Sequence, residues 1–146
     1  MIKWFQTKVR YQKIDDRTGK FKMVNENYLV DAVSFTEAEA RITEQMAQLI
    51  STDFSISAIN KTNYTDIVNE GNGAYLFKVK IDFIQVDDSS GKESKASNYM
   101  LVYADKIEEV TDLVKTYLET MVVPYNVSAV SDSNILNIFP YFEKQE

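Results

Sequence analysis

Apolar and polar residues alternate from position 4 to position 12 of the chain, which is the pattern of a half-buried β-strand. The apolar side of this strand is formed by Phe5, Thr7, Val9 and Tyr11. A turn containing Asp and Gly follows at 15–20, and a return strand begins at Phe21. The alternation slips at 25–27, as a β-bulge or a short break would cause. The pattern predicts an antiparallel hairpin.

A helix with one apolar face is predicted after this hairpin. Ser34 stands at the expected N-cap, and Glu37 three residues later completes a reciprocal capping box. Apolar residues recur at steps of three and four, at Phe35, Ala38, Ile42, Met46, Leu49 and Ile50. A further extended segment begins at Phe54 and continues less clearly to Val68. These patterns predict the element order ββαβ.

The same series begins again after a polar linker at 69–73. An alternating strand starts at Tyr75, and Asp105 with Glu108 forms a second capping box. The apolar stripe of the second helix comprises Ile107, Val110, Leu113, Val114, Tyr117, Leu118 and Met121. The matching positions keep a nearly constant offset: Lys8-Val9 with Lys78-Val79, Asp15 with Asp87, Ser34 with Asp105, and Ala58 with Ala129. Four echoes in the same order indicate a duplicated unit.

The fold class that follows is α+β, with a tandem duplicated ββαβ repeat and antiparallel sheet or sheets on which two helices pack. We expect a single domain over 1–146, with repeat one at 1–68, repeat two at 74–142 and a linker at 69–73. One repeat alone would bury only a marginal core. The two halves are therefore expected to share a sheet or to pack against each other, rather than to form independent beads.

Composition removes several classes of chemistry. The chain has no Cys and no His, which excludes disulfides, thiolate sites and imidazole catalysis. A metal could be held only by carboxylates and carbonyls. The acidic pairs that could supply them, at 15–16 and 87–88, lie in predicted hairpin turns where Asp is common. We therefore expect no metal site, no cofactor and no enzymatic activity.

Charge is unevenly distributed along the chain. The net charge is −6, yet residues 1–24 contain seven basic and two acidic residues, which leaves a local net charge of +5. Basic and aromatic side chains interleaved on a sheet can hold single-stranded nucleic acid, because bases stack on the rings while cations follow the phosphates. The candidate binding residues are Trp4, Lys8, Arg10 and Lys22. The other interpretation is that the cations are solvated strand residues and the rings belong to the core.

A second functional hypothesis is a structural or assembly protein, such as a phage-related one, that contacts itself or a protein partner. Exposed strand edges and the aromatic segment at 138–146 would make those contacts; that segment either closes a sheet edge or docks a partner. No window reaches the ~18 apolar residues that a membrane helix needs, and the N-terminus lacks the apolar core of a signal peptide. We expect a cytoplasmic protein with no membrane contact.

Three groups of residues also resemble an uncharacterised family. They are Trp4-Phe5 with Lys8-Val9-Arg10-Tyr11, Tyr28-Leu29-Val30-Asp31-Ala32 with the run from Ser34 to Arg41, and Phe139-Pro140-Tyr141. The family that they resemble is a domain of unknown function, similar in length to this chain, found in Bacteroidota and in their phages or mobile elements. The resemblance implies a cytoplasmic or phage-encoded protein. It brings no activity and no site residues.

Overall fold

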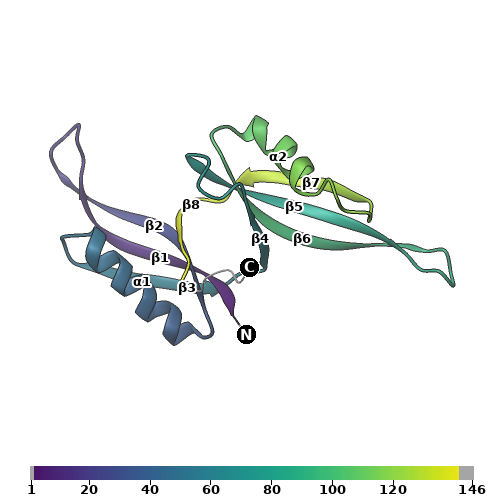
Figure 1. Ribbon diagram of the computed structural model, residues 1–146. Helices are drawn as coiled ribbons and strands as arrows, with labels where there is room; N and C mark the ends of the chain where they lie inside the picture. The colour runs from purple at the N-terminus through teal and green to yellow at the C-terminus, as the bar shows by residue number, and fades with distance from the viewer. Residues whose placement is uncertain (1, 142–146) are drawn as a thin grey trace. The chain divides into compact units, whose positions relative to one another are not determined.

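The computed structural model describes residues 2–141, which form two four-stranded sheets, each covered on one face by a helix (Figure 1). The fold is α+β, as predicted. The first half contains β1 (Lys3–Ile14), β2 (Phe21–Ala32), α1 (Phe35–Leu49), β3 (Phe54–Lys61) and β4 (Tyr64–Val68). The second half contains β5 (Tyr75–Val86), β6 (Glu93–Ala104), η1 (Ile107–Glu109), α2 (Val110–Tyr117), β7 (Tyr125–Asp132) and β8 (Ile135–Phe139).

The two sheets exchange their last strands. The first has the order β3-β1-β2-β8 and the second the order β4-β6-β5-β7. β4 pairs in parallel with β6, and β8 pairs in parallel with β2. The first compact unit therefore consists of the described residues in 1–62 and 135–146, and the second is Asn63–Asn134. These units differ from the sequence repeats at 1–68 and 74–142, because each repeat ends in a strand that joins the other unit.

The exchange has a simple geometric cause. β1 is antiparallel to both β2 and β3, so β2 and β3 run in the same direction. A strand in the position of β8 is thus parallel to β3, and a parallel return within one sheet needs a crossover of roughly a dozen residues. Only Thr62 and Asn63 connect β3 to β4. The chain cannot return, so β4 pairs in the second sheet.

The strand registers correct two details of the prediction. The hairpin β1–β2 pairs without interruption from Lys3–Ala32 to Ile14–Phe21, so the break predicted at 25–27 is wrong for this pair. β2 does have an irregularity beside the predicted position, at Asn27/Tyr28 opposite β8. Two further irregularities occupy matching places in the two sheets, at Lys8/Val9 opposite β3 and at Lys80/Ile81 opposite β7. These matching bulges align the two hairpins, so that Lys8 corresponds to Lys80 and not to Lys78.

The two helices begin differently. Ser34 Oγ accepts a hydrogen bond from Glu37 N (3.1 Å), and Glu37 Oε1 accepts one from Val33 N (3.1 Å), which confirms the first capping box with a one-residue shift. The second capping box is wrong. Asp105 Oδ1 accepts a hydrogen bond from Ala74 N (3.0 Å) instead, and neither η1 nor α2 has a side-chain cap. The Asp105 carboxylate is therefore bound to Ala74 and does not cap the second helix.

Each unit has its own core between sheet and helix. In the first, Ala38, Ile42 and Met46 of α1 pack on β1 and β2. In the second, Val110, Val114 and Leu118 occupy the matching positions and pack on β5 and β6. Phe35, Leu49, Ile107, Tyr117 and Met121, which the sequence placed on the apolar stripes, are exposed. Within the described part of the chain, no helix is both long enough and apolar enough to cross a bilayer.

Candidate nucleic-acid interface

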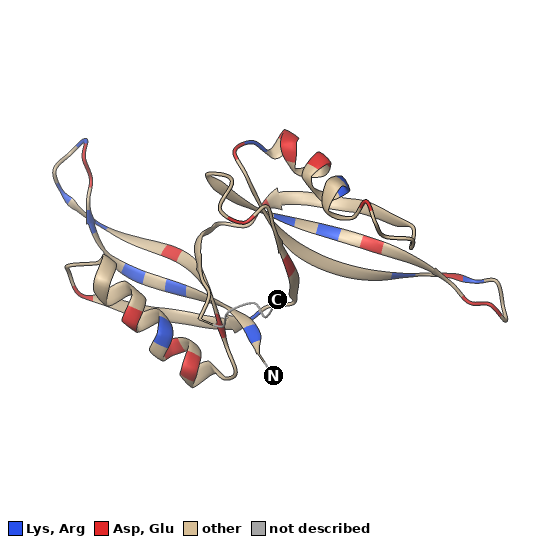
Figure 2. Cartoon of the chain, in the orientation of Figure 1, with Lys and Arg blue, Asp and Glu red and all other residues tan. Residues whose placement is uncertain are grey.

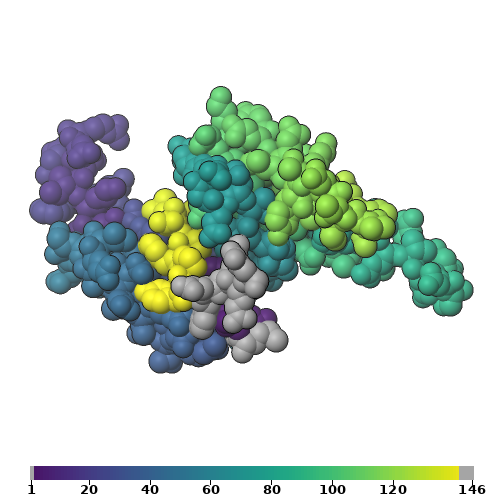
Figure 3. Space-filling view, in the orientation of Figure 1, coloured from purple at the N-terminus to yellow at the C-terminus, as the bar shows by residue number. Residues whose placement is uncertain are grey.

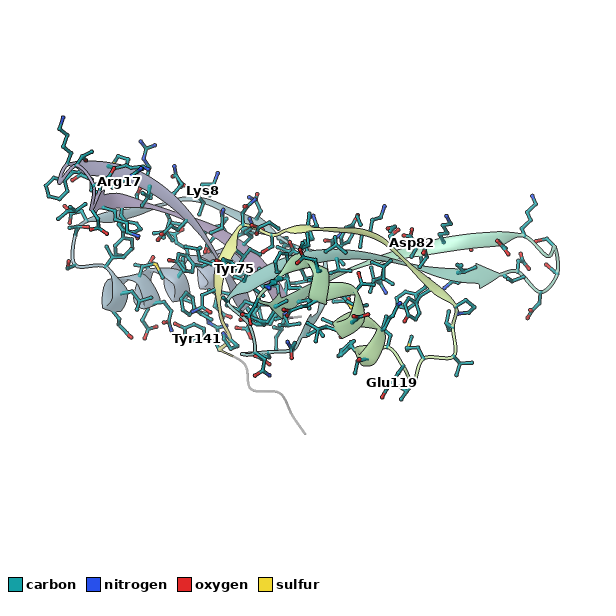
Figure 4. The ribbon with its side chains drawn as sticks, turned by 90° about the horizontal axis from the view of Figure 1, so that it is seen from above. Lys8, Arg17, Tyr75, Asp82, Glu119 and Tyr141 are labelled. Carbon is teal, nitrogen blue, oxygen red and sulfur yellow. The ribbon has the colours of Figure 1, made fainter. Side chains whose placement is uncertain are left out.

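The strand register of β1 and β2 separates their side chains into two faces. Phe5 and Val9 point toward α1 and belong to the core. Because successive side chains of a strand point to opposite sides, Lys8 and Arg10 lie on the other side of the sheet, which we call the helix-free face. Both are exposed. Figure 4 shows Lys8 on the side of the sheet away from α1.

Lys22 does not join the other candidate residues. It is the cross-strand partner of Lys13, which lies an even number of residues from Tyr11 and Val9 and so faces the helix side. Lys22 is exposed near the end of the hairpin. The structure thus brings Trp4, Lys8 and Arg10 to one face and places Lys22 on the opposite one.

Trp4 lies on the helix-free face but is only half-exposed. Its backbone carbonyl accepts hydrogen bonds from Thr62 N (3.0 Å) and Thr62 Oγ1 (2.9 Å). These bonds hold the start of β1 against the residue at which the chain leaves the first sheet. Trp4 therefore sits at a structurally constrained position and is a poorer stacking platform than the sequence suggested.

Phe21 is the exposed aromatic residue of this face. Its side chain is 64% exposed, and its cross-strand partner is Ile14, which is also exposed. Met23, opposite Gln12, extends the same exposed apolar patch. The sequence placed Phe21 at the start of the return strand but not among the candidate binding residues, because its face depends on the turn that sets the register. That turn is formed by 15–20, where Gly19 adopts a φ of 70° and Arg17 N donates to Asp15 Oδ1 (2.9 Å).

The helix-free face of the first hairpin carries no acidic residue between Gln6 and Ile14 or between Phe21 and Leu29. The cations Lys8 and Arg10 are opposite Asn27 and Asn25. Glu26, the acidic residue of this stretch, points to the helix side, where it accepts hydrogen bonds from Tyr11 Oη (2.7 Å) and Tyr28 Oη (3.0 Å). A hollow of about 660 Å³ adjoins Arg10, between β1 and residues 51–55, and the acidic Asp53 is among the residues that line it.

The tyrosines bound to Glu26 hold their protons tightly. Burial, with the hydrogen bond and charge of Glu26 adding to it, raises the pKa of Tyr11 to about 12. The pKa of Tyr28 is raised further, again mainly by burial. Neither tyrosine is therefore suited to give up a proton near neutral pH. No group of three or more acidic residues that could hold a metal ion occurs among the described residues.

The second hairpin presents a different helix-free face. Lys78 and Lys80 are half-buried, and Asp82 stands in the place of Arg10. Asp82 is buried and accepts a hydrogen bond from Ser97 Oγ (2.7 Å), which lowers the pKa of its carboxyl group. Figure 4 shows Asp82 on the side away from α2. This face combines both signs of charge.

Net charge makes the same distinction between the hairpins. Residues 3–32 contain seven basic and four acidic residues, a net charge of +3, whereas residues 75–104 contain four of each. Lys8 and Arg10 occupy alternate positions of β1, whereas Lys78 and Lys80 are followed by Asp82 on β5. Figure 2 shows basic residues on β1 and residues of both charges on β5. Figure 3 shows that the end of each hairpin projects from the body of its own unit. Only the first hairpin is a cationic arm.

The described part of the C-terminal aromatic segment closes a sheet edge. β8 lies along β2, and Phe139 stacks on Tyr28 with ring centroids 5.4 Å apart. Tyr141 N donates to Asp31 Oδ1 (2.7 Å), and Arg41 lies 4.7 Å from the centre of the Tyr141 ring. The remainder of that segment, 142–146, lies outside the described residues.

The chain matches a protein family of unknown function. The family model with the description "Domain of unknown function (DUF4494)" matches residues 3–141. No curated protein and no solved structure matches the chain.

Proposed function

Because the chain belongs to this family of unknown function, which assigns it no activity, we propose a function from its own residues: a non-catalytic protein that binds single-stranded nucleic acid on the helix-free face of β1–β2. The observation that carries the proposal is that exposed Lys8 and Arg10 share the helix-free face with exposed Phe21, along a stretch of β1 and β2 that carries no acidic residue on that face. The proposal places the protein in the cytoplasm of a member of the Bacteroidota or of a cell that its phages infect.

The chemistry of this face favours a single strand. A strand with unpaired bases can stack a base on Phe21 while its phosphates approach Lys8 and Arg10. A duplex keeps its bases paired and stacked, so it could use only the two cations. Stacking of one base on an aromatic ring contributes roughly 1–3 kcal/mol by alanine substitution.

The overall acidity of the chain limits how such a complex would behave. A net charge of −6 repels a polyanion at long range, so the local positive field of the hairpin has to outweigh it. Added salt screens the hairpin's attraction and removes the counterion-release contribution, with a slope of about −0.7 per phosphate neutralised for single strands. Two cations predict a shallow slope, between about −1 and −2.

Fluorescence anisotropy with labelled oligothymidylate and oligouridylate tests the proposal. We expect Lys8→Gln with Arg10→Gln to weaken binding at least tenfold and to flatten the salt slope, and Phe21→Ala to weaken it without changing the slope. Lys80→Gln is the matched control, because Lys80 corresponds to Lys8 in the second hairpin. An affinity that does not change with salt concentration, or that is the same in the Lys8→Gln and Arg10→Gln double variant, would refute the proposal.

Assembly is the second candidate function, and the patch of Ile14, Phe21 and Met23 is the observation that favours it. Apolar side chains at the end of a projecting hairpin can pack on a second copy or on a protein partner. Light scattering after size-exclusion chromatography distinguishes the two candidates. A stable oligomer that Phe21→Ala dissociates, without nucleic-acid affinity in the parent protein, would establish assembly in place of nucleic-acid binding.

A further inference from the structure

The second unit contains a groove of about 490 Å³ between α2, the residues that follow it, and strands β5 and β6. Its wall is mainly apolar and is formed by Phe83, Ala96, Met100, Leu118, Met121 and Val123. Small-molecule sites in proteins occupy roughly 300–1,000 Å³ and are lined mostly by such residues. The groove therefore has the size and the lining of a ligand site.

The first unit fills the corresponding positions with a polar network. In the alignment that pairs Lys8 with Lys80, Tyr11, Glu26 and Tyr28 correspond to Phe83, Asn98 and Met100. Both tyrosines of the first unit donate hydrogen bonds to Glu26. No such bonds link the three residues of the second unit, and their side chains line the open groove instead. The second helix is also shorter, with 8 residues against 15 in α1, so it covers less of the strands beneath it.

One charged residue lines this groove. Asp66, on β4, accepts hydrogen bonds from Tyr117 Oη to Oδ1 (2.8 Å) and from Thr65 Oγ1 to Oδ2 (3.0 Å). The ion pairs found among residues 2–141 involve Arg41 and do not include Asp66. Two neutral hydroxyl groups orient the carboxylate but leave its charge uncompensated, and an ionised carboxylate has further acceptor positions. The complement of this site is a cation.

We propose that the groove binds a small organic ammonium ion. The aromatic or aliphatic body of the ligand lies against Phe83, Met100 and Leu118, and its protonated amine donates to Asp66. Charge complementarity excludes anions, and a neutral analogue gains only the apolar contact. This site belongs to the second unit and is independent of the cationic hairpin of the first.

A titration of the full chain, followed by ¹⁵N–¹H NMR, tests the proposal with two probes of nearly equal shape. Phenethylamine is protonated at pH 7, whereas 2-phenylethanol is neutral. We expect both to shift resonances of the groove residues, and the amine to bind about tenfold more tightly, as a charge-assisted hydrogen bond allows. Asp66→Asn should remove that tenfold preference and leave the affinity for the alcohol unchanged.

A second pair of variants tests the location. Ala96→Phe fills the groove from β6 and should abolish the shifts caused by both probes, while the dispersion of the remaining spectrum shows that the unit is folded. Ala129→Phe, on exposed β7 outside the groove, should bind like the parent protein. Equal affinities for the two probes, an unchanged preference in Asp66→Asn, shifts centred elsewhere, or no shifts at millimolar concentration would each overturn the proposal.

Discussion

The two units of this chain share a buried framework but differ on the helix-free face of the hairpin and in the region beside the helix. Helix residues at matching positions are buried in both: Ala38 and Val110, Ile42 and Val114, Met46 and Leu118. The bulges match as well, because Ser57 Oγ donates to the carbonyl of Lys8 and Ser128 Oγ to that of Lys80, each at 3.3 Å. The framework is what the duplication has kept.

The surfaces have diverged in complementary ways. The first unit has a cationic helix-free face and a closed network of Tyr11, Glu26 and Tyr28. The second has Asp82 in place of Arg10 and an open groove beside α2. Buried and exposed positions alternate along the same strands. The exposed residues can therefore change, and form different sites in the two units, while the buried residues keep the same fold.

The largest expected effect tests whether the two cores are equivalent. Ile42→Ala should lower the free energy of unfolding by about 4 kcal/mol, because a fully buried β-branched side chain is lost and a cavity remains. Val114→Ala, at the matching position, removes a smaller apolar side chain, so it should lower the free energy of unfolding by about 1 kcal/mol less than Ile42→Ala does. Urea unfolding followed by the fluorescence of Trp4, which lies in the first unit, and by circular dichroism measures both.

Thr43→Ala is the control, since the next helical residue is exposed and should change stability by less than about 0.5 kcal/mol. A cost below about 1 kcal/mol for Ile42→Ala would mean that α1 is not the cover of the first core. A larger cost for Val114→Ala than for Ile42→Ala would contradict the equivalence of the two helices.

The sequence predicts this framework well because periodicity reports burial directly. Alternation marked β1 and β5, and the steps of three and four marked both helices. The exchange of β4 and β8 escaped prediction, since an apolar pattern states that a strand is buried but not which neighbour it pairs with. The short connection between β3 and β4 does indicate the pairing, because the two residues Thr62 and Asn63 cannot form a parallel crossover within the first sheet.

The candidate site was partly predictable for the same reason. Lys8 and Arg10 share a face with Trp4 by parity along one strand, so the sequence grouped them correctly. Lys22 and Phe21 lie on the other strand, and their faces depend on where the turn at 15–20 sets the register. The groove at Asp66 could not be predicted from the sequence, because β4 lies near α2 only through its pairing with β6 in the second sheet.

An intermediate effect tests the difference between the helix starts. Ser34→Ala should destabilise the first unit by about 1 kcal/mol, because the hydrogen bond from Glu37 N to Ser34 Oγ is lost. Lys106→Ala, at the matching position before η1, should change stability by less than about 0.5 kcal/mol, since no side-chain cap exists there. Thermal unfolding of the two variants gives both values. Equal costs would show that the second helix is capped in solution.

The smallest expected effect is a change in the pKa of Tyr11, which donates a hydrogen bond to Glu26. Glu26→Gln should lower the pKa of Tyr11 from about 12 toward 10 without reaching it, because the charge of Glu26 is removed while the burial that makes the largest contribution remains. A raised tyrosine pKa means that the folded state holds the proton more tightly than the unfolded one. Its contribution to stability is therefore complete below pH 10 and is lost as the pH rises through about 12.

Absorbance or ¹³C NMR titration of the tyrosine rings measures this shift, and Asn98→Gln serves as the control at the matching position of the second unit. In the parent protein, stability should fall above pH 10, and in Glu26→Gln the fall should begin at the same pH but be smaller and end at a lower pH, since less of the tyrosine proton's binding energy is tied to folding. An unchanged Tyr11 pKa in Glu26→Gln would mean that burial alone holds the proton.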